Sequence, residues 1–208
     1  MEITVLPYNL PDMAVLDSPG EFEYSIWQPD RIYVILGRSN TASASLYTQT
    51  IQNDGVMILK RPSGGESVIL SPKMLVFSVK MRFQNKMNSR FLFKQINDLL
   101  IKYLSEVGIE NLHSRGISDL SIDSRKIMGS SIYLNRDTLF YHAVLNISED
   151  ISLISRYLKH PSREPDYRRG RGHEEFVTSL YREGYNLSFE VLANQIFLVM
   201  KELQSEIN

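Results

Sequence analysis

The hydrophobic positions of this chain fall into short apolar runs, typical of strands, and spaced apolar stripes, typical of helices. Residues 125–128 and 131–134 are short runs on either side of Gly129, and with the long run that follows they predict a meander of hairpins. The clearest runs of β-branched and aromatic residues predict strands over residues 31–36, 56–60, 74–81 and 138–147.

The helical stripes are best developed in the middle and at the end of the chain. One helix is predicted from a cap at Asn88 or Ser89 to Gly108, with an apolar face of Ile96, Leu99, Leu100, Tyr103, Leu104 and Val107. The last helix, residues 188–205, carries a stripe of Phe189, Leu192, Ile196, Val199 and Leu203. Weaker patterns predict helices over residues 41–53 (closed near Gly55), 150–158 and 174–183 (closed by Gly184).

The order of these elements favours an α+β domain around one mostly antiparallel or mixed central sheet flanked by helices. Residues 1–30 are expected to be strand or irregular structure, and residues 111–123 a loop with a short strand. A doubly wound sheet is disfavoured because the sequence has no Gly-x-Gly-x-x-Gly and no regular βαβ alternation. We find no linker or repeat, so 208 residues are expected to form a single domain.

Composition narrows the function classes. Apolar residues make up 43% and charged residues 23%, with a formal net charge of −1, so a general nucleic-acid or membrane binder is not expected. The chain has no cysteine, which excludes disulfides, thiolate metal sites and a cysteine nucleophile. The N-terminus shows no secretory pattern and the apolar stretch 191–200 is too short to span a bilayer, so a cytoplasmic location is expected.

The turn Lys60-Arg61-Pro-Ser-Gly-Gly-Glu66 lies between two predicted strands and has the features of an anion site. Gly64 and Gly65 allow close approach of the backbone, whose N–H groups can form a concave anion site. Arg61 adds a possible bidentate contact to phosphate or carboxylate. An ordinary hairpin turn is the alternative, and it is the more frequent outcome for such a sequence taken alone.

The second informative stretch is Asp119-Leu-Ser-Ile-Asp-Ser-Arg125-Lys126-Ile-Met-Gly129-Ser130. A lysine between strand-forming residues is a compact donor that can hold a carboxylate and an α-phosphate together. The alternative is an exposed strand lysine before a turn, the commoner role of a single lysine.

Taken together, these stretches resemble the lipoate–protein ligase A family, within the biotin and lipoate ligase and transferase superfamily. The resemblance spans about residues 30 to 180 and rests on the order of several motifs. These are Gly37-Arg38-Ser39-Asn40 after a strand, the Lys60–Gly65 turn, the Asp119–Ser130 stretch, and the strand containing His142.

The resemblance implies the α+β fold shared by biotin ligases and class II aminoacyl-tRNA synthetases, and an enzyme that uses ATP and Mg²⁺ to activate lipoate or octanoate as an acyl-AMP. The acyl group would pass to a lysine of a lipoyl carrier domain, from a 2-oxoacid dehydrogenase or the glycine cleavage H protein. Lys126 would be the catalytic residue and Asp119 a possible metal ligand. The implied substrate- and adenylate-binding residues are Arg38, Asn40, Arg61, Ser63, Gly64, Gly65, Ser67, Ser118, Asp119, Gly129, Ser130 and His142.

The sequence departs from the family pattern at several positions. Glu66 replaces a glycine, Leu70 (or Ser71) stands where a histidine is usual, and Lys60 replaces an arginine. A carboxylate beside a phosphate site is unfavourable unless it faces a metal, a basic partner or solvent. We expect no C-terminal accessory domain within residues 1–208, so a separate accessory subunit is a possible requirement.

Two other functions stay open: a catalytically silent lipoyl-binding or partner subunit, and an ATP-independent lipoyl or octanoyl transferase. The basic segment after residue 156 has two equal interpretations, contact with the nucleotide or an acidic carrier through Arg163, Arg168, Arg169 and Arg171, or a solvated loop balanced by acidic neighbours. Metal-ligand spacing is lacking for all four histidines, which are predicted to be structural: His113, His142, His160 and His173.

Overall fold

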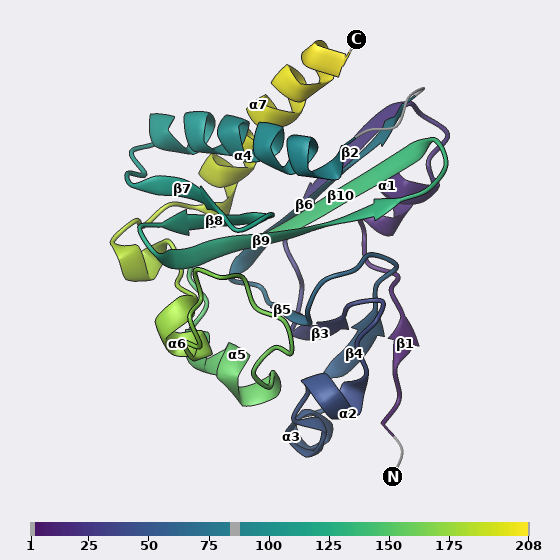
Figure 1. Cartoon of the computed structure of the whole chain (residues 1–208), viewed down its shortest axis with the longest axis vertical. Coiled ribbons are helices and arrows are strands. Elements are labelled where there is room, and N and C mark those ends of the chain that lie inside the picture. Colours follow the sequence, from purple (N-terminus) through teal and green to yellow (C-terminus); the bar gives the residue numbers. More distant parts are fainter. Residues whose placement is uncertain (1–2, 84–87, 208) are drawn as a thin grey trace.

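The computed structural model describes residues 3–83 and 88–207, and they form two sheets with helices packed on their outer faces (Figure 1). The larger sheet is antiparallel and has six strands in the order β2-β6-β10-β9-β8-β7. Its strands are β2 (Phe22–Trp27), β6 (Met74–Arg82), β7 (Leu112–Arg115), β8 (Asp119–Ile122), β9 (Arg125–Leu134) and β10 (Thr138–Asn146).

The smaller sheet is mixed and has four strands in the order β1-β4-β3-β5. Strand β4 is parallel to β1 and β3, whereas β5 is antiparallel to β3. These strands are β1 (Leu6–Pro7), β3 (Tyr33–Leu36), β4 (Met57–Lys60) and β5 (Val68–Leu70). The predicted α+β class is therefore confirmed, but the expectation of one sheet is wrong, because the early strands pair among themselves.

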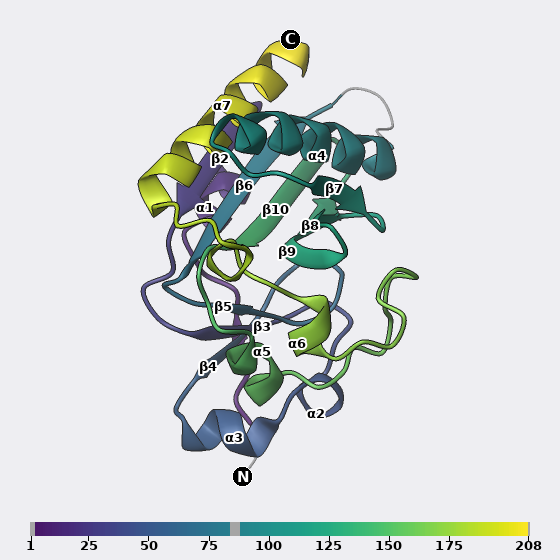
Figure 2. The ribbon, with the colours of Figure 1, turned by 90° about the vertical axis from the view of Figure 1, so that its left-hand side faces the viewer.

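Two long helices, α4 (Ser89–Glu106) and α7 (Phe189–Ile207), cover one face of the larger sheet (Figures 1 and 2). The Asn88 side chain caps α4 by accepting a hydrogen bond from the Arg90 N–H at 3.0 Å, as predicted. Their apolar stripes pack on alternate residues of β6 and β10 to form the main core, which includes Leu75, Phe77, Ile96, Leu100, Tyr141, Leu192, Ile196 and Val199.

Two short helices pack against the smaller sheet at the other end of the molecule (Figure 1). Helix α3 (Thr48–Asn53) and helix α5 (Ile151–Tyr157) contribute Ile51 and Ile154 to a second core with Val34 and Leu36. The other helical elements are α1 (Met13–Asp17), α2 (Ala42–Ser45), α6 (His173–Phe176) and the 3₁₀ turn Tyr181–Glu183. In the described part of the chain, none of the helices combines the length and apolarity needed to cross a membrane.

Four predictions differ from the structure. The helix expected over 41–53 is interrupted, because Leu46 is extended and forms an isolated bridge with Leu158. The helix expected over 174–183 is reduced to α6 and the 3₁₀ turn, since Val177 lies beside β9 and the Thr178 N–H donates to the Lys126 carbonyl oxygen at 2.8 Å. The two runs flanking Gly129 form one continuous strand, β9, and a helix, α1, lies within residues 1–30.

Candidate active site

A cavity of about 1570 Å³ lies between the two sheets. Its walls come from β3 and β5 of the smaller sheet, from β6, β9 and β10 of the larger sheet, and from the segment 158–168. Part of the lining is apolar: Ile35, Val68, Ile69, Leu70, Met74, Val76, Ala143 and Val144. The cavity thus has an apolar portion and a polar portion, in which the two motif stretches meet.

The glycine turn is held in shape by its own arginine. The Arg61 guanidinium donates through Nη2 to the carbonyl oxygens of Gly64 at 2.7 Å and Glu66 at 2.8 Å. Gly65 has a φ of +87°, a conformation that glycine adopts without strain. Burial lowers the pKa of Arg61 to about 10, so the group remains charged at neutral pH.

The two turns of the smaller sheet are in direct contact. A Cβ built on Gly37 would lie 1.9 Å from the Gly65 carbonyl oxygen. The Arg38 N–H donates to the Ser63 carbonyl oxygen at 2.9 Å, and the Gly37 N–H donates to Asn40 Oδ1 at 3.1 Å. Residue 37 therefore has to be glycine for the turns to pack this closely.

A buried chain of hydrogen bonds runs from the glycine turn into the N-terminal region. Ser63 Oγ lies 2.6 Å from His142 Nε2, and His142 Nδ1 lies 3.5 Å from Asp12 Oδ2. Tyr8 donates its hydroxyl to Asp12 at 2.8 Å. Burial lowers the pKa of His142, which favours the neutral ring that accepts from Ser63.

A serine nucleophile and its histidine base are connected in the same way. Ser63 is too deeply buried to act as a nucleophile. Ser63 is 1% exposed, does not line the cavity, and also accepts from Arg61 Nε at 3.0 Å. An acyl group cannot approach a hydroxyl that is enclosed in this way. The chain of bonds instead fixes the turn to β10.

Lys126 lies inside the cavity on the face of the larger sheet opposite the long helices. Its Nζ is 2.7 Å from Asp119 Oδ1, and its side chain is 28% exposed. A Cβ built on Gly129 would come within 2.8 Å of the same Nζ, so the lysine side chain lies across the bare backbone of Gly129. Ser131, on the same strand, donates to the Gly64 carbonyl oxygen at 2.9 Å and joins β9 to the glycine turn.

A β-bulge sets the direction of this lysine. Asp119 pairs with Gly129 and Leu120 with Met128, but Ser121 pairs with Lys126, so β9 has one extra residue at Ile127. In a regular strand residues 126 and 129 would point to opposite faces. The extra residue places them on the same face, and consecutive Ile127 and Met128 both join the helix-covered core.

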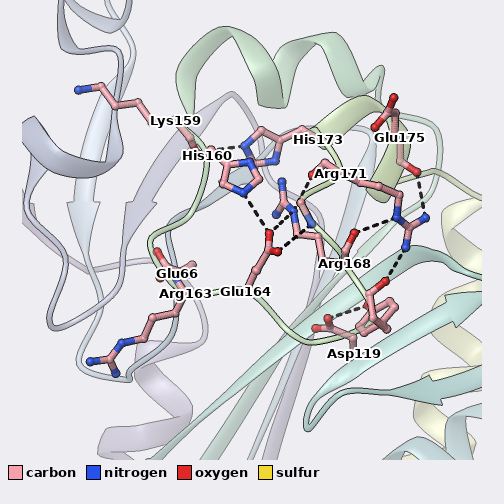
Figure 3. Close-up of polar contacts among 12 residues, drawn as sticks. Glu66, Asp119, Lys159, His160, Arg163, Glu164, Arg168, Arg171, His173 and Glu175 are labelled. Carbon is pink, nitrogen blue, oxygen red and sulfur yellow. Dashed lines mark hydrogen bonds and ion pairs between the residues drawn. The ribbon is translucent and has the colours of Figure 1, made fainter.

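Residues 159–172, which we call the strap, form another wall of the cavity. Tyr167 donates its hydroxyl to Asp119 Oδ2 at 2.8 Å, so the carboxylate contacts both Tyr167 and Lys126. Figure 3 shows Asp119 next to Glu164, Arg168 and Arg171 of the strap. Burial and the nearby Asp119 charge raise the pKa of Tyr167, which keeps its hydroxyl a donor.

Charged side chains of the strap bind one another and nearby backbone groups. Glu164 accepts from the Gly170 N–H at 2.8 Å and lies 3.0 Å from His160 Nε2. Arg171 donates to the carbonyl oxygens of Ser124 at 3.0 Å and Tyr167 at 2.9 Å. Arg168 is 4% exposed and packs over the Phe176 ring, so it is not part of a solvated loop, whereas Arg163 and Arg169 are exposed. Contact of these arginines with a nucleotide or an acidic carrier stays a prediction.

The structure brings most of the predicted site residues to one cavity. Those that line it are Asn40, Arg61, Gly65, Ser67, Ser118, Asp119, Lys126, Gly129, Ser130 and His142. Arg38, Ser63 and Gly64 do not line the cavity. Arg38 is exposed, and Ser63 and Gly64 take part in the hydrogen bonds that hold the glycine turn. Ser130 donates its hydroxyl to the Ser118 carbonyl oxygen at 2.8 Å, so these two residues hold the β8–β9 hairpin.

Sequence reasoning missed three participants: Tyr8, Asp12 and Tyr167. Tyr8 and Asp12 lie in a stretch without a clear pattern, and only the fold shows that Asp12 is fully buried beside His142. Tyr167 lies in the basic segment, where no motif distinguishes a tyrosine hydroxyl that donates from one that does not. His142, predicted to be structural by its spacing and a binding residue by resemblance, lines the cavity and anchors the turn.

The surroundings of Asp119 bear on its predicted role as a metal ligand. In residues 3–83 and 88–207, no three His, Asp or Glu side chains are grouped so as to hold a metal ion. Both Asp119 oxygens already have protein partners. The assignment of Asp119 as a metal ligand stays a prediction, since each carboxylate oxygen keeps a second lone pair for a further ligand.

Comparison with known families identifies the domain. Residues 20–201 match the family model described as the lipoyl protein ligase A/B catalytic domain. The chain belongs to this family. The predicted resemblance is thereby confirmed, and the match extends beyond the residues 30 to 180 that carried it.

Several curated relatives of the family are similar in sequence. The lipoate-protein ligase LplJ of Bacillus subtilis is 25% identical over 139 residues, which cover 67% of this chain and 41% of the relative. Lipoate-protein ligase A subunit 1 of Thermoplasma acidophilum is 22% identical over 180 residues, 73% of this chain and 68% of that subunit. The match to the probable lipoate-protein ligase A of Mycoplasma pneumoniae spans only 36% of that relative's length.

Solved structures share the fold. The bi-partite lipoate protein ligase of Thermoplasma acidophilum superposes with a TM-score of 0.77 and 20% identity, covering 97% of this chain and 83% of that one. Biotin protein ligase of Aquifex aeolicus has a TM-score of 0.50 at 14% identity, over 65% of this chain and 54% of that one. The family fold predicted from the sequence is therefore confirmed.

Proposed function

We propose that the chain is a lipoate–protein ligase that activates lipoate or octanoate with ATP and transfers the acyl group to a lysine of a lipoyl carrier domain. The names of its relatives support the reaction class. Structures with the same fold were solved with lipoic acid in one case and ATP in another. One neighbour is described together with its E2 lipoyl domain, which supports a carrier of that kind.

The observation that carries the proposal is the placement of Lys126. Its ammonium group lies in the cavity, across Gly129, within reach of Asp119 and on the strand that contacts the glycine turn. A cation fixed by a strand and a carboxylate needs no reorganisation when negative charge develops beside it.

Unpartnered polar groups support an anionic ligand. Arg61 Nη1, Arg168 Nη2 and Ser67 Oγ are buried, belong to residues that line the cavity, and have no hydrogen-bond partner among the described residues. Leaving such donors unpaired costs about 1–3 kcal/mol each, more for charged groups, which a carboxylate or phosphate would offset. The apolar part of the lining suits the hydrocarbon chain of the acid.

The proposed chemistry has two steps. A carboxylate oxygen of the acid attacks the α-phosphorus of ATP, and the bond to the β-phosphate oxygen breaks to release pyrophosphate. The ε-amine of the carrier lysine then attacks the acyl carbonyl, AMP leaves, and the amine loses a proton. Lys126 stabilises the negative charge that develops on the phosphoryl and carbonyl oxygens in these steps.

The proposal includes Mg²⁺ bound together with ATP. The described residues do not form a resident metal site, and Mg²⁺ is commonly held by substrate phosphates, waters and one or two carboxylates. Asp119 is the carboxylate beside the proposed phosphate position.

A separate accessory subunit is also part of the proposal. This chain spans about two fifths or less of the length of the first curated relatives it matches, 36% and 41% in two cases. Its coverage is larger for a relative named as subunit 1 and for a bi-partite ligase.

The proposal is tested by incubating the purified chain with ATP, Mg²⁺, lipoate and a lipoyl domain, then weighing the domain by mass spectrometry. ATP-dependent gain of a lipoyl group supports the ligase, and a domain whose target lysine is replaced by arginine is the control. Gain only from an acylated donor carrier, without ATP, indicates a transferase. Pyrophosphate release without a carrier tests the first step alone, and absence of both activities indicates a silent binding subunit.

A further inference from the structure

Glu66, the residue that departs from the family glycine, has an unexpected set of partners. Its Oε1 accepts from Ser162 Oγ at 3.2 Å and from the Arg163 N–H at 3.1 Å. Its Oε2 accepts from Asn40 Nδ2 at 3.3 Å. Among residues 3–83 and 88–207 this carboxylate forms no ion pair and belongs to no metal-binding group, although its negative charge acts on the nearby guanidinium of Arg61.

These contacts attach one part of the strap to the glycine turn. Tyr167, farther along the same segment, donates to Asp119, the partner of Lys126. The strap therefore extends from the smaller sheet at Glu66 to the larger sheet at Asp119, and residues between these points line the cavity.

We propose that Glu66 is a positioning residue that holds the strap across the cavity and so keeps the glycine turn and Lys126 in one enclosed site. The exposed strap residues Ser162 and Arg163 have no burial that would fix them. The Glu66 carboxylate holds this part of the strap, between Lys159, whose N–H donates to the Ser45 carbonyl oxygen at 2.9 Å, and Tyr167 at Asp119. Where the proposed reaction occurs, enclosure keeps water from the acyl-AMP.

The strap offers a test that does not depend on activity. Trypsin cleaves after Lys and Arg, and the segment contains Lys159, Arg163, Arg168, Arg169 and Arg171. A segment is cut only when it opens locally. We compare the wild-type chain with Glu66→Ala, which removes the acceptor, and Glu66→Gln, whose side-chain oxygen can still accept from the strap.

Asp166→Ala is the matched control. Asp166 is an exposed carboxylate on the strap itself, and the described residues make no hydrogen bond or ion pair with its side chain. We expect Glu66→Ala to be cut within residues 159–171 at least about tenfold faster than the wild type, with Glu66→Gln and Asp166→Ala within about twofold of it. Cleavage of Glu66→Ala at the wild-type rate, or spread over the whole chain, contradicts the proposal.

The second measurement rests on the proposed ligase function and counts AMP formed for each carrier acylated. An acyl-AMP that meets water yields free acid and AMP, so leakage raises this ratio. We expect a ratio near one for the wild type and Glu66→Gln, and a several-fold increase for Glu66→Ala; an unchanged ratio in Glu66→Ala overturns the enclosing role. If the wild type acylates no carrier, the ligase proposal fails, and the cleavage rates alone still decide whether Glu66 fixes the strap.

Discussion

The two sheets contribute to the cavity in different ways. The smaller sheet contributes turns beyond the ends of its strands, and their side chains mostly bind backbone of the same or neighbouring turns, as Arg61 does. The larger sheet contributes side chains from within β8, β9 and β10. Strand pairing holds Asp119 and His142 on both sides, whereas Lys126 pairs with Ser121 on one side and forms an isolated bridge with Val177 on the other.

The two sheets therefore differ in role: the turns of the smaller sheet shape the site, and the side chains of the larger sheet are placed to act on the reacting groups. Groups on paired strands keep their direction without further support, and Lys126 needs only Asp119 and a bare glycine beside it. The turns depend on tethers, which come from Arg61, from Ser63 through His142, and from Ser131. Substitutions on the larger sheet should therefore affect rate, and substitutions in the turns should affect stability and ligand retention.

The largest effect is expected for Lys126→Ala. Loss of a fixed cation at the reacting atoms should lower acyl-AMP formation by about 10²–10³-fold or more. The lysine side chain lies in a cavity rather than in a core, so the melting temperature should stay near that of the wild type. Pyrophosphate release and thermal unfolding measure the two quantities, and full activity in a folded Lys126→Ala protein would refute the assignment.

Gly129→Ala tests the same lysine without removing it. The new Cβ would lie 2.8 Å from Lys126 Nζ and 2.9 Å from Cε, and the flexible end of the lysine would move. A displacement near 1 Å at a reacting group costs about 10- to 100-fold in rate. We expect kcat to fall by that amount while stability changes little, and Gly172→Ala, whose Cβ meets no atom within 4 Å, is the control.

Gly37→Ala tests the turns. Its Cβ would meet the Gly65 carbonyl oxygen at 1.9 Å, and backbone has to shift to relieve the overlap. Overpacking of this kind costs about 1–3 kcal/mol of unfolding free energy. Denaturant unfolding should show this loss for Gly37→Ala but not for Gly64→Ala, where a Cβ meets nothing within 4 Å; equal stability of both variants would count against the close contact.

The smallest effect concerns pH. Burial lowers the pKa of His142 in the folded chain, so below about 6.5 the unfolded chain binds more protons. The contribution of His142 to the free energy of unfolding is complete above a pH of about 6.5. It falls on acidification by up to about 1.4 kcal/mol per pH unit. Burial lowers the pKa of His173 as well. The free energy of unfolding, measured from pH 7 to 5.5, should therefore depend less steeply on pH in His142→Gln than in the wild type, and the same holds for His173→Gln. An unchanged slope in His142→Gln would show that this ring is already charged when folded.

Much of the fold could be predicted because local patterns and tertiary packing agree in the long elements. The stripes of α4 and α7 and the apolar runs of β6 and β10 each bury the face that the sequence indicates. The failures lie where tertiary pairing overrides the local pattern. Val177 leaves the helical register to lie beside Lys126, and Leu46 interrupts a helix to pair with Leu158.

The site was predictable in its motifs but not in its contacts. The sequence contains Lys126 and Gly129 three residues apart, yet only the bulge at Ile127 puts them on one face. The strap partners of Glu66, Ser162 and Arg163, lie 96 and 97 residues away in a segment with no regular pattern. No local rule specifies such a contact, because it depends on how the strap crosses between the sheets.

The contact of Gly37 with Gly65 has a mechanical consequence. Since one bare backbone rests directly on the other, neither turn can shift toward its neighbour independently, and a ligand that pushes on one must carry the second along. Glu66 adjoins that contact and reaches the strap, so three chain segments far apart in the sequence should respond to a bound molecule as a single moving body.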